Sequence, residues 1–359
     1  MASDTTMNAS GVQAQEAAAR PYAPSWINRV TAFVDRLGPP FWFVYFVLWL
    51  TLFTVLTILR WRDGVYPMGT FSISDVVLSG TGIFFVALVH YLDRWASSKL
   101  MEYRWAIKAS DQEGAALLYQ LTVLPALPTA LASLIALVFA ILTYLFLPLS
   151  YRFLNLNLST PSGTLQLANF FLSWCTFGML SYHAFRQLKM GSFITTNYLR
   201  INLFQLNPLY AFAGLALRTA TGWLIVASAW AITTPNLLEH VAILVTVTFM
   251  QIVAVVTFIT PLLGAHALLE QEKARLQRDI GHRMETTIGA LNQSIGTSDN
   301  EELRELNTVL SSLLMAEQRL EKTPTWPWRP GTIRWLSTAI LLPLALWVIQ
   351  TLMQRFFMR

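Results

Sequence analysis

The chain has 359 residues, of which 54% are hydrophobic and 13% charged, and its mean hydropathy is +0.47. Soluble domains contain about 45–50% apolar and about 25% charged residues, so this composition excludes a soluble globular protein. The apolar residues form runs of roughly 20, the length that an α-helix needs to cross a bilayer, whereas β-barrel strands are about 10 residues long and strictly alternating. The sequence therefore predicts an all-α, polytopic protein of the lipid bilayer. Its net charge of +5 gives no reason to expect a nucleic-acid partner.

The first helix along the chain is predicted to lie in the membrane interface. Residues 1–24 are small and polar and are expected to form a disordered tail. Residues 25–38 then form an interfacial amphipathic helix, with Ser25 as its expected N-terminal cap. One face of this helix carries Trp26, Val30, Phe33, Val34 and Leu37.

Seven apolar runs follow, and the last is set apart from the others. Residues 39–264 hold six of them with short connections, and we predict a six-helix transmembrane bundle there. The pattern of the second run continues as a helix towards Ala109. The seventh run lies in residues 330–359, after a charged segment. Lys and Arg gather in the N-terminal segment and in the second, fourth and sixth connections, so the positive-inside rule predicts a cytoplasmic N-terminus and an external C-terminus.

The charged segment, residues 265–329, is predicted to be a cytoplasmic helical hairpin. Leu and Ile recur in it every three or four residues, at a near-heptad spacing that is typical of a coiled coil. Gly296 interrupts the pattern, Ser298 with Glu301 matches a capping box, and Pro324 ends the second helix. Two helices alone bury little apolar surface. We therefore expect the hairpin to assemble a homo-oligomer, the alternative being a monomer that docks a partner.

Polar residues inside the apolar runs are the default functional candidates, because they are costly in hydrocarbon. Arg218 lies in the fifth run and Gln251 in the sixth. Arg218 has an alternative interpretation, in which its side chain reaches the cytoplasmic headgroups. His90, His183 and His266 fall near the cytoplasmic ends of the second, fourth and sixth runs. They could bind a metal or a proton, but helix ends gather polar residues in any case, and we expect neither a metal nor a cofactor.

The seventh run has a composition that is typical of a pore wall. Uncharged amides and hydroxyls flank an apolar stretch, which can gate a pore by dewetting. The alternative is that the amides bond to neighbouring helices. The candidate pore-lining residues are Ser337, Leu341, Leu344, Trp347, Val348, Gln350, Thr351 and Gln354.

Several seven-helix families and enzyme classes are excluded by residues that the chain lacks. The seventh run has no lysine for a retinal Schiff base, as microbial rhodopsins need, and no pair of histidines for zinc, as hydrolases like the adiponectin receptors need. The motifs HExxH, GxSxG and Walker A are also missing. We therefore expect no enzymatic activity.

Seven spans, a cytoplasmic N-terminus, an external C-terminus and a long sixth helix that descends into the cytoplasm together resemble the insect olfactory and gustatory receptors. The Tyr-to-Gln-Phe signature of that family is not matched, and only Gln350 corresponds to it. The resemblance implies four subunits that assemble through cytoplasmic helices and a cation pore lined by the last helix. It also implies a small-molecule ligand in a pocket among the outer halves of the earlier helices.

The resemblance thus implies an oligomeric, tetrameric ligand-gated cation channel, and we expect it in the plasma membrane. The lack of eukaryotic targeting signals favours a bacterial inner membrane. One alternative is a membrane sensor or scaffold that signals through residues 265–329 to a soluble partner. Another is a secondary transporter, which should show an inverted repeat or paired broken helices.

Overall fold

The computed structural model describes residues 21–156, 158–200, 203, 205–234, 237–294, 300–327 and Thr338. These residues are all helical or irregular, and no named strand occurs among them. The α-helices are α2 (Trp26–Arg36), α3 (Phe41–Arg62), α4 (Ile73–Glu102), α5 (Asp111–Thr122), α6 (Ala126–Phe146), α7 (Pro161–Asn197), α8 (Asn207–Thr233), α9 (Val241–Ser294) and α10 (Asn300–Lys322). Short 3-10 helices lie at η1 (Arg104–Ala106), η2 (Pro148–Leu154) and η3 (Leu237–Glu239).

Five of these helices are long and apolar enough to cross a membrane, namely α3, α4, α6, α8 and the first part of α9. The protein is therefore a polytopic α-helical integral membrane protein, as its composition predicts. The seventh run is, apart from Thr338, outside the described residues. So are all the candidate pore-lining residues, Ser337, Leu341, Leu344, Trp347, Val348, Gln350, Thr351 and Gln354, together with residues 1–20 and Ser298 of the predicted capping box.

Helices α4 and α7 run side by side in the same direction. Asp75 near the start of α4 accepts a hydrogen bond from Gln166 near the start of α7. Farther along both helices, Asp93 contacts His183 at 2.8 Å. At about 1.5 Å per residue, Asp75 and Asp93 are about 27 Å apart along α4, close to the thickness of a bilayer core. We name the two ends of the bundle the Asp75 end and the Asp93 end.

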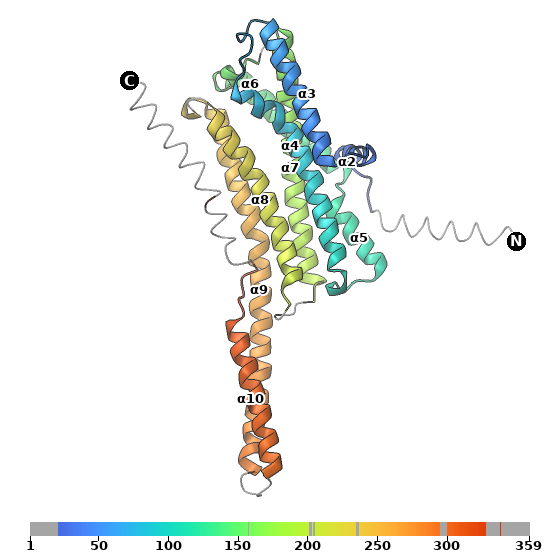
Figure 1. Cartoon of the computed structure of the whole chain (residues 1–359), viewed down its shortest axis with the longest axis vertical. Helices are drawn as coiled ribbons and strands as arrows, with labels where there is room; N and C mark the ends of the chain where they lie inside the picture. Colours follow the sequence, from blue (N-terminus) through green and yellow to red (C-terminus); the bar gives the residue numbers. More distant parts are fainter. Residues whose placement is uncertain are drawn as a thin grey trace, which may run out of the picture.

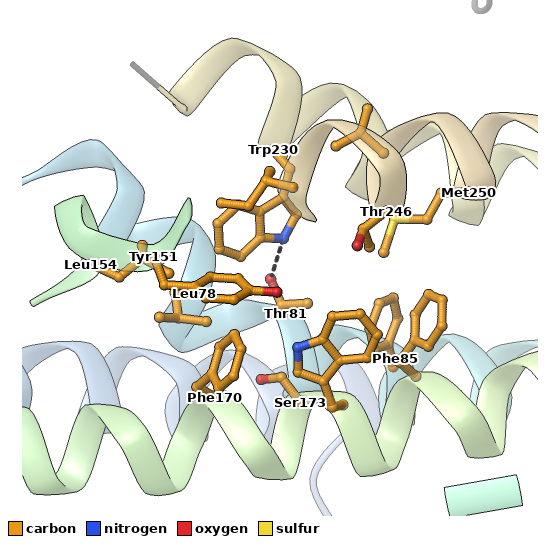
Figure 2. A pocket seen from close by; sticks show the side chains of 14 residues that line it. Leu78, Thr81, Phe85, Tyr151, Leu154, Phe170, Ser173, Trp230, Thr246 and Met250 are labelled. Atoms are coloured by element: carbon orange, nitrogen blue, oxygen red, sulfur yellow. Dashed lines mark hydrogen bonds between the residues drawn. The ribbon is translucent and has the colours of Figure 1, made fainter. Parts of the chain in front are cut away.

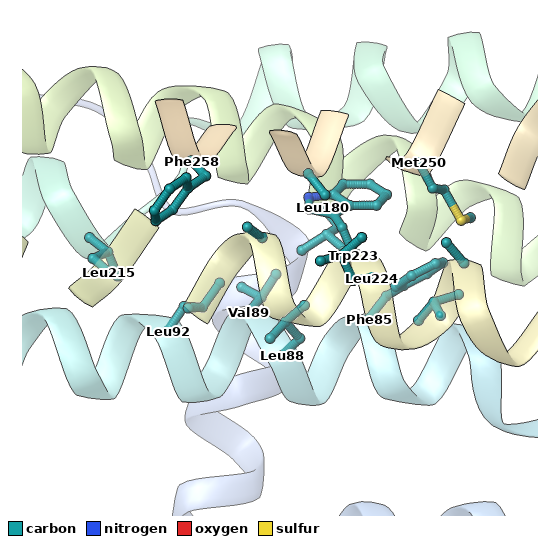
Figure 3. Close-up of a cluster of buried hydrophobic side chains, with 14 of the residues drawn as sticks. Phe85, Leu88, Val89, Leu92, Leu180, Leu215, Trp223, Leu224, Met250 and Phe258 are labelled. Carbon is teal, nitrogen blue, oxygen red and sulfur yellow. The ribbon is translucent and has the colours of Figure 1, made fainter. Parts of the chain in front are cut away.

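Helix α8 runs antiparallel to α4, and α9 returns beside it. The indole of Trp230 in α8 donates to Thr81 at the Asp75 end, and Arg218 donates to Tyr91 at the Asp93 end. The buried core lies where α4, α7, α8 and α9 meet (Figure 3). Trp223 is fully buried there, and Leu88 packs directly against the backbone of Gly222. A Cβ atom at Gly222 would overlap Leu88, so only glycine allows α8 to approach α4 this closely.

Helix α2 lies where the interfacial helix is predicted, but two details differ. Its buried residues are Ile27, Thr31 and Val34, while three of the predicted apolar face, Val30, Phe33 and Leu37, point away from the bundle. Exposed apolar groups on a short amphipathic helix suit contact with the bilayer interface. Ser25 is not a side-chain cap: its hydroxyl donates to Asn28 at 2.8 Å instead.

The connection after α4 contains a helix that the sequence analysis does not identify. α4 ends at Glu102 rather than continuing towards Ala109, and α5 begins after Ser110. Ser110 and Glu113 form a capping box, in which the Ser110 backbone N–H donates to the Glu113 carboxylate at 2.8 Å. This hydrogen bond lowers the pKa of Glu113 and so favours its charged form at the start of α5.

Helices α9 and α10 form an antiparallel hairpin that projects beyond the Asp93 end (Figure 1). α9 is continuous over 54 residues, about 81 Å at 1.5 Å per residue, although Pro261 lies within it. Where the hairpin returns towards the bundle, Lys273 donates to the backbone carbonyls of Glu321 and Thr323. Leu320 is buried against α9 at the same place. The outer faces of the hairpin are exposed in the described residues, including Leu314 and Met315.

Candidate functional site

A line of buried polar side chains follows one face of α7, which we name the α7 stripe. Its members are spaced alternately by three and four residues, so they lie on one face of the helix. In chain order they are Gln166, Asn169, Ser173, Thr176, His183 and Gln187, all no more than 6% exposed. Leu180 takes the one apolar place in this series. Most of α4 that faces the stripe is also buried, so the stripe meets protein rather than lipid.

At the Asp75 end, the stripe meets a buried ion pair between α3 and α4. Arg60 contacts Asp75 at 2.9 Å, and their side chains are only 1% and 5% exposed. Arg60 also donates to the hydroxyl of Tyr66 and to the carbonyl of Leu154. Burial and the Asp75 charge raise the pKa of Tyr66, which keeps its phenol protonated. The guanidinium is thus satisfied on several sides, as a buried charge must be.

At the Asp93 end, two further carboxylates pair with histidines. Asp93 of α4 accepts hydrogen bonds from Gln187 at 3.0 Å and from His183 at 2.8 Å. Asp35 of α2 lies 3.1 Å from His90 and 3.0 Å from Arg94. Together these contacts tie the interfacial helix, α4 and α7 to one another near one membrane face. An open groove of about 1250 Å³ borders Asp35, His90 and Asp93.

The three candidate histidines are not brought together. His90 and His183 are held by different carboxylates, while His266 stacks on Trp326 at a ring distance of 3.9 Å, on α9. Within the described part of the chain, no three His, Cys, Asp or Glu side chains form a group that could hold a metal ion. His90 and Asp93 share a helix face as the spacing predicts, but each forms its side-chain hydrogen bonds with residues of other helices.

Between the two polar ends, the interface of α4 with α7 is apolar. Phe85 and Val89 of α4 and Met179 and Leu180 of α7 fill it, and each is no more than 1% exposed. From Thr176 to His183 this layer is about 10 Å thick at 1.5 Å per residue. An ion would lose its hydration here without finding polar replacements. The α4–α7 interface is therefore sealed against ions.

A small pocket lies in the half of the bundle nearer Asp75 (Figure 2). Its volume is about 60 Å³, room for a few water-sized atoms. Residues from α4, η2, α7, α8 and α9 line it, ten of which are labelled in Figure 2: Leu78, Thr81, Phe85, Tyr151, Leu154, Phe170, Ser173, Trp230, Thr246 and Met250. Aromatic and aliphatic groups dominate, with hydroxyls at Thr81, Ser173 and Thr246. Such a lining suits a small apolar molecule with at most one or two hydrogen-bonding groups.

The end of the hairpin is fastened to α9 close to the bundle. The ring of His266 stacks on the ring of Trp326, and the two ring planes are 6° apart. His266 forms no hydrogen bond with a side chain of α4 or α7. Its Nδ1 atom lies 3.0 Å from the carbonyl of Thr325 and its Nε2 atom 3.2 Å from Glu270. We name His266, Thr325 and Trp326 the hairpin clamp. The clamp holds the end of the hairpin against α9. From this point the chain continues towards the seventh run.

Arg218 and Gln251, the two predicted intramembrane polar residues, have different surroundings. Arg218 lies over the ring of Trp95 at 4.3 Å and donates to Tyr91 and to the carbonyl of Gly214. Tyr91 and Trp95 are close to Asp93 on α4, so Arg218 lies towards the Asp93 end of the bundle. Gln251 is half-buried on α9 and makes no hydrogen bond to another described residue.

The buried charges Arg60, Asp75 and Asp93 are not among the residues predicted from the sequence. The alternating spacing of three and four residues between the polar residues of α7 is the sequence signal that could have indicated the α7 stripe. No protein-family model, curated protein or solved structure matches the chain, so its function is argued from its own geometry.

Proposed function

We propose that the protein is an oligomeric, ligand-gated cation channel of the plasma membrane, in which the last helix of each subunit lines a shared pore. The observation that carries this proposal is the course of α9. Ile243, Val247 and Met250 of α9 line the small apolar pocket, and His266 of the same continuous helix belongs to the hairpin clamp. A molecule that enters the pocket and displaces α9 would therefore also displace the start of the seventh run.

The sealed α4–α7 interface supports a pore between subunits rather than within one. Phe85, Val89 and Leu180 leave no polar route between the two charged ends of these helices. The residues that line a conducting pore must therefore come from another part of the chain. The seventh run, with Gln350 and Gln354 beside its apolar stretch, has the composition for that wall.

The proposed topology has seven spans with a cytoplasmic N-terminus. α7 counts as a span in this proposal because it follows α4 from the Asp75 end to the Asp93 end, although its own hydropathy is lower. The Asp93 end is then cytoplasmic, since α2 and the basic connections lie there. The pocket falls in the outer half, and the hairpin projects into the cytoplasm. The protein acts without enzymatic chemistry or cofactor in this proposal.

Assembly through the hairpin is tested first. The full chain, purified in detergent, should have the mass of a tetramer. In the single chain, the side chains of Leu314 and Met315 on α10 are 46% and 59% exposed. Contacts between subunits would bury these apolar side chains. L314E together with M315E should yield monomers. S311E changes an exposed polar residue of the same helix and should leave the tetramer intact.

Conduction is tested on the same protein in liposomes. The tetramer should pass monovalent cations, and Q350A should change the selectivity among them. W326A removes the stack on His266 and should change the flux while the mass of the complex stays the same. W105A, at a tryptophan that is 62% exposed and outside the clamp, should change neither. A monomer without flux would reject the channel; a tetramer without flux that retains a soluble protein through residues 265–327 would support the scaffold instead.

A further inference from the structure

A second cavity, at the Asp93 end, is lined by an arginine, Arg218, with which no carboxylate of the described residues forms an ion pair. Its volume is about 340 Å³, within the size range of small-molecule sites. Residues of α4, α8 and α9 line it. Two of them, Lys99 and Arg218, are cationic, and no acidic residue belongs to the lining. We name this the Arg218 cavity.

The guanidinium of Arg218 is held only by neutral groups. Its Nε atom donates to the Tyr91 hydroxyl at 2.9 Å and one Nη atom donates to the carbonyl of Gly214 at 3.1 Å, while the Trp95 ring lies beneath it. Among the described residues no carboxylate forms an ion pair with it. Arg60, the fully buried arginine of the bundle, by contrast pairs with the carboxylate of Asp75.

The chain near the cavity cannot supply the missing anion. Pro327 lines the cavity, and from there to residue 359 the sequence contains no Asp or Glu side chain. Lys99, the second cation, pairs with Glu102 at 2.5 Å, but Glu102 lies outside the lining. A charge near hydrocarbon without a counter-charge is unfavourable, so an anion from solution or from the membrane would be stabilised here.

The remaining walls are apolar and aromatic. Leu217, Phe258 and Leu262 line the cavity beside Arg218, and Trp95 closes one side. Tyr91 and Trp95 are about 27 and 33 Å along α4 from Ile73, at 1.5 Å per residue, which is near the far surface of the hydrocarbon core. Cationic groups at this depth, with apolar walls beside them, match a molecule that has an anionic head and a hydrocarbon chain.

We propose that the Arg218 cavity binds an anionic amphiphile, whose phosphate or carboxylate group pairs with Arg218 and Lys99 and whose hydrocarbon part lies against Phe258 and Leu262. Tyr210 lines the same cavity and can donate a hydrogen bond to the head group. Because the cavity lies between α4, α8 and α9, its occupant would contact the helix that also carries the hairpin clamp. The site does not depend on the protein being a channel.

The test uses the full-length protein in neutral detergent, with bound molecules counted by native mass spectrometry. The probes are phosphatidylglycerol, phosphatidylcholine with the same acyl chains, and oleate. Phosphatidylglycerol or oleate should bind with at least about tenfold higher affinity than phosphatidylcholine, since a hydrogen bond to a charged group is worth that much. Tight binding of phosphatidylglycerol alone identifies a membrane lipid as the source, and tight binding of oleate alone identifies a free fatty acid.

Variants assign the binding to this cavity. R218Q should weaken anion binding by about tenfold or more. R218K keeps the charge but loses the planar guanidinium that lies over Trp95, so it should weaken anion binding less than R218Q does. K99Q, at a side chain that is one-third exposed, should weaken it less and leaves folding intact. R36Q, at an exposed arginine of α2 outside the cavity, should have no effect. Equal binding of phosphatidylcholine, or unchanged anion binding in both R218Q and K99Q, would overturn the proposal.

Discussion

The more apolar spanning helices of this protein are less buried than the more polar ones. The most apolar windows of α3, α6 and α9 have mean hydropathies of 2.2, 2.3 and 2.4, yet only 17%, 22% and 33% of their residues are buried. Those of α4 and α8 have mean hydropathies of 1.7 and 1.4, and 56% of their residues are buried. In a soluble protein the order is the reverse, because apolar side chains fill the core. Lipid is as apolar as leucine, so polar groups, rather than apolar ones, gather where other helices can satisfy them.

Helix α7 shows the same principle most clearly. It is not among the helices that hydropathy alone selects as spans, although it packs against α3, α4, α6 and α9. Its low hydropathy comes from the α7 stripe, which is buried against α4. Three substitutions would test whether polar pairs and close backbone contacts hold the central helices together, while the peripheral surface of the bundle contributes little.

Removing the buried arginine should have the largest effect. R60A leaves Asp75 charged and unpaired at 5% exposure, which we expect to reduce the free energy of unfolding by about 3–5 kcal/mol. Unfolding in mixed detergent micelles would measure it. The control R62A changes an arginine that is 63% exposed, two residues away, and should cost less than about 1 kcal/mol. Replacing both partners, R60M with D75L, should recover most of the loss. Equal stability of R60A and R62A would contradict a structural role for the pair.

Adding one methyl group between α6 and α7 should have the next largest effect. A Cβ atom at Gly178 would collide with the carbonyl oxygen of Ala132 and lie 2.7 Å from the Cβ atom of Ala136. G178A should therefore lower the free energy of unfolding by about 1–3 kcal/mol. G281A, in the exposed part of α9 with open space around it, should raise stability by up to about 1 kcal/mol, because alanine favours a helix. If G178A and G281A changed the free energy of unfolding in the same direction, close packing of α6 on α7 would not be the cause of the G178A effect.

The smallest effect is expected from a single amide of the α7 stripe. Asn169 donates to the carbonyl of Leu78 at 3.0 Å, and N169L should cost about 1 kcal/mol. Its counterpart L172A lies on the same helix at a side chain that is 58% exposed, where lipid replaces the lost contacts, so its effect should be close to zero. Thermal unfolding of the two variants in detergent would compare them. If L172A lost more thermal stability than N169L, apolar side chains would contribute more to stability than buried polar ones here, as they do in soluble proteins.

Secondary structure was predictable from the sequence where periodicity was strong. The spacing of leucines, with Gly296 and Pro324 as breaks, predicts two helices in residues 265–329, and α9 and α10 end at Ser294 and Lys322. The short helix α5 was missed, although Ser110 and Glu113 carry a capping signature. Its twelve residues are only weakly amphipathic and are fewer than the roughly 20 that a membrane-spanning helix needs, so neither pattern indicates a helix there.

The candidate site was predictable only in part. The residues His90 and His183 were identified, but their partners Asp35 and Asp93 lie on other helices, and one sequence does not show which helices are neighbours. Arg60 lies at the end of the first run, where positive charges usually face water or headgroups, so its burial could not be predicted from its position. Its burial follows from Asp75, whose charge draws it inward, and only the packing of α3 on α4 brings the two together.

The low hydropathy of α7 has a consequence for how the chain enters the membrane during synthesis. Insertion depends on the apolarity of a segment before its final partners have packed around it. In the proposed topology, Gln166, Asn169, His183 and Gln187 would make α7 a poor candidate for insertion on its own. α4 and α6 precede it in the chain, and α6 packs closely on Gly178. We therefore expect α7 to enter the bilayer together with α6, as a pair, at a site where α4 already offers Asp75 and Asp93.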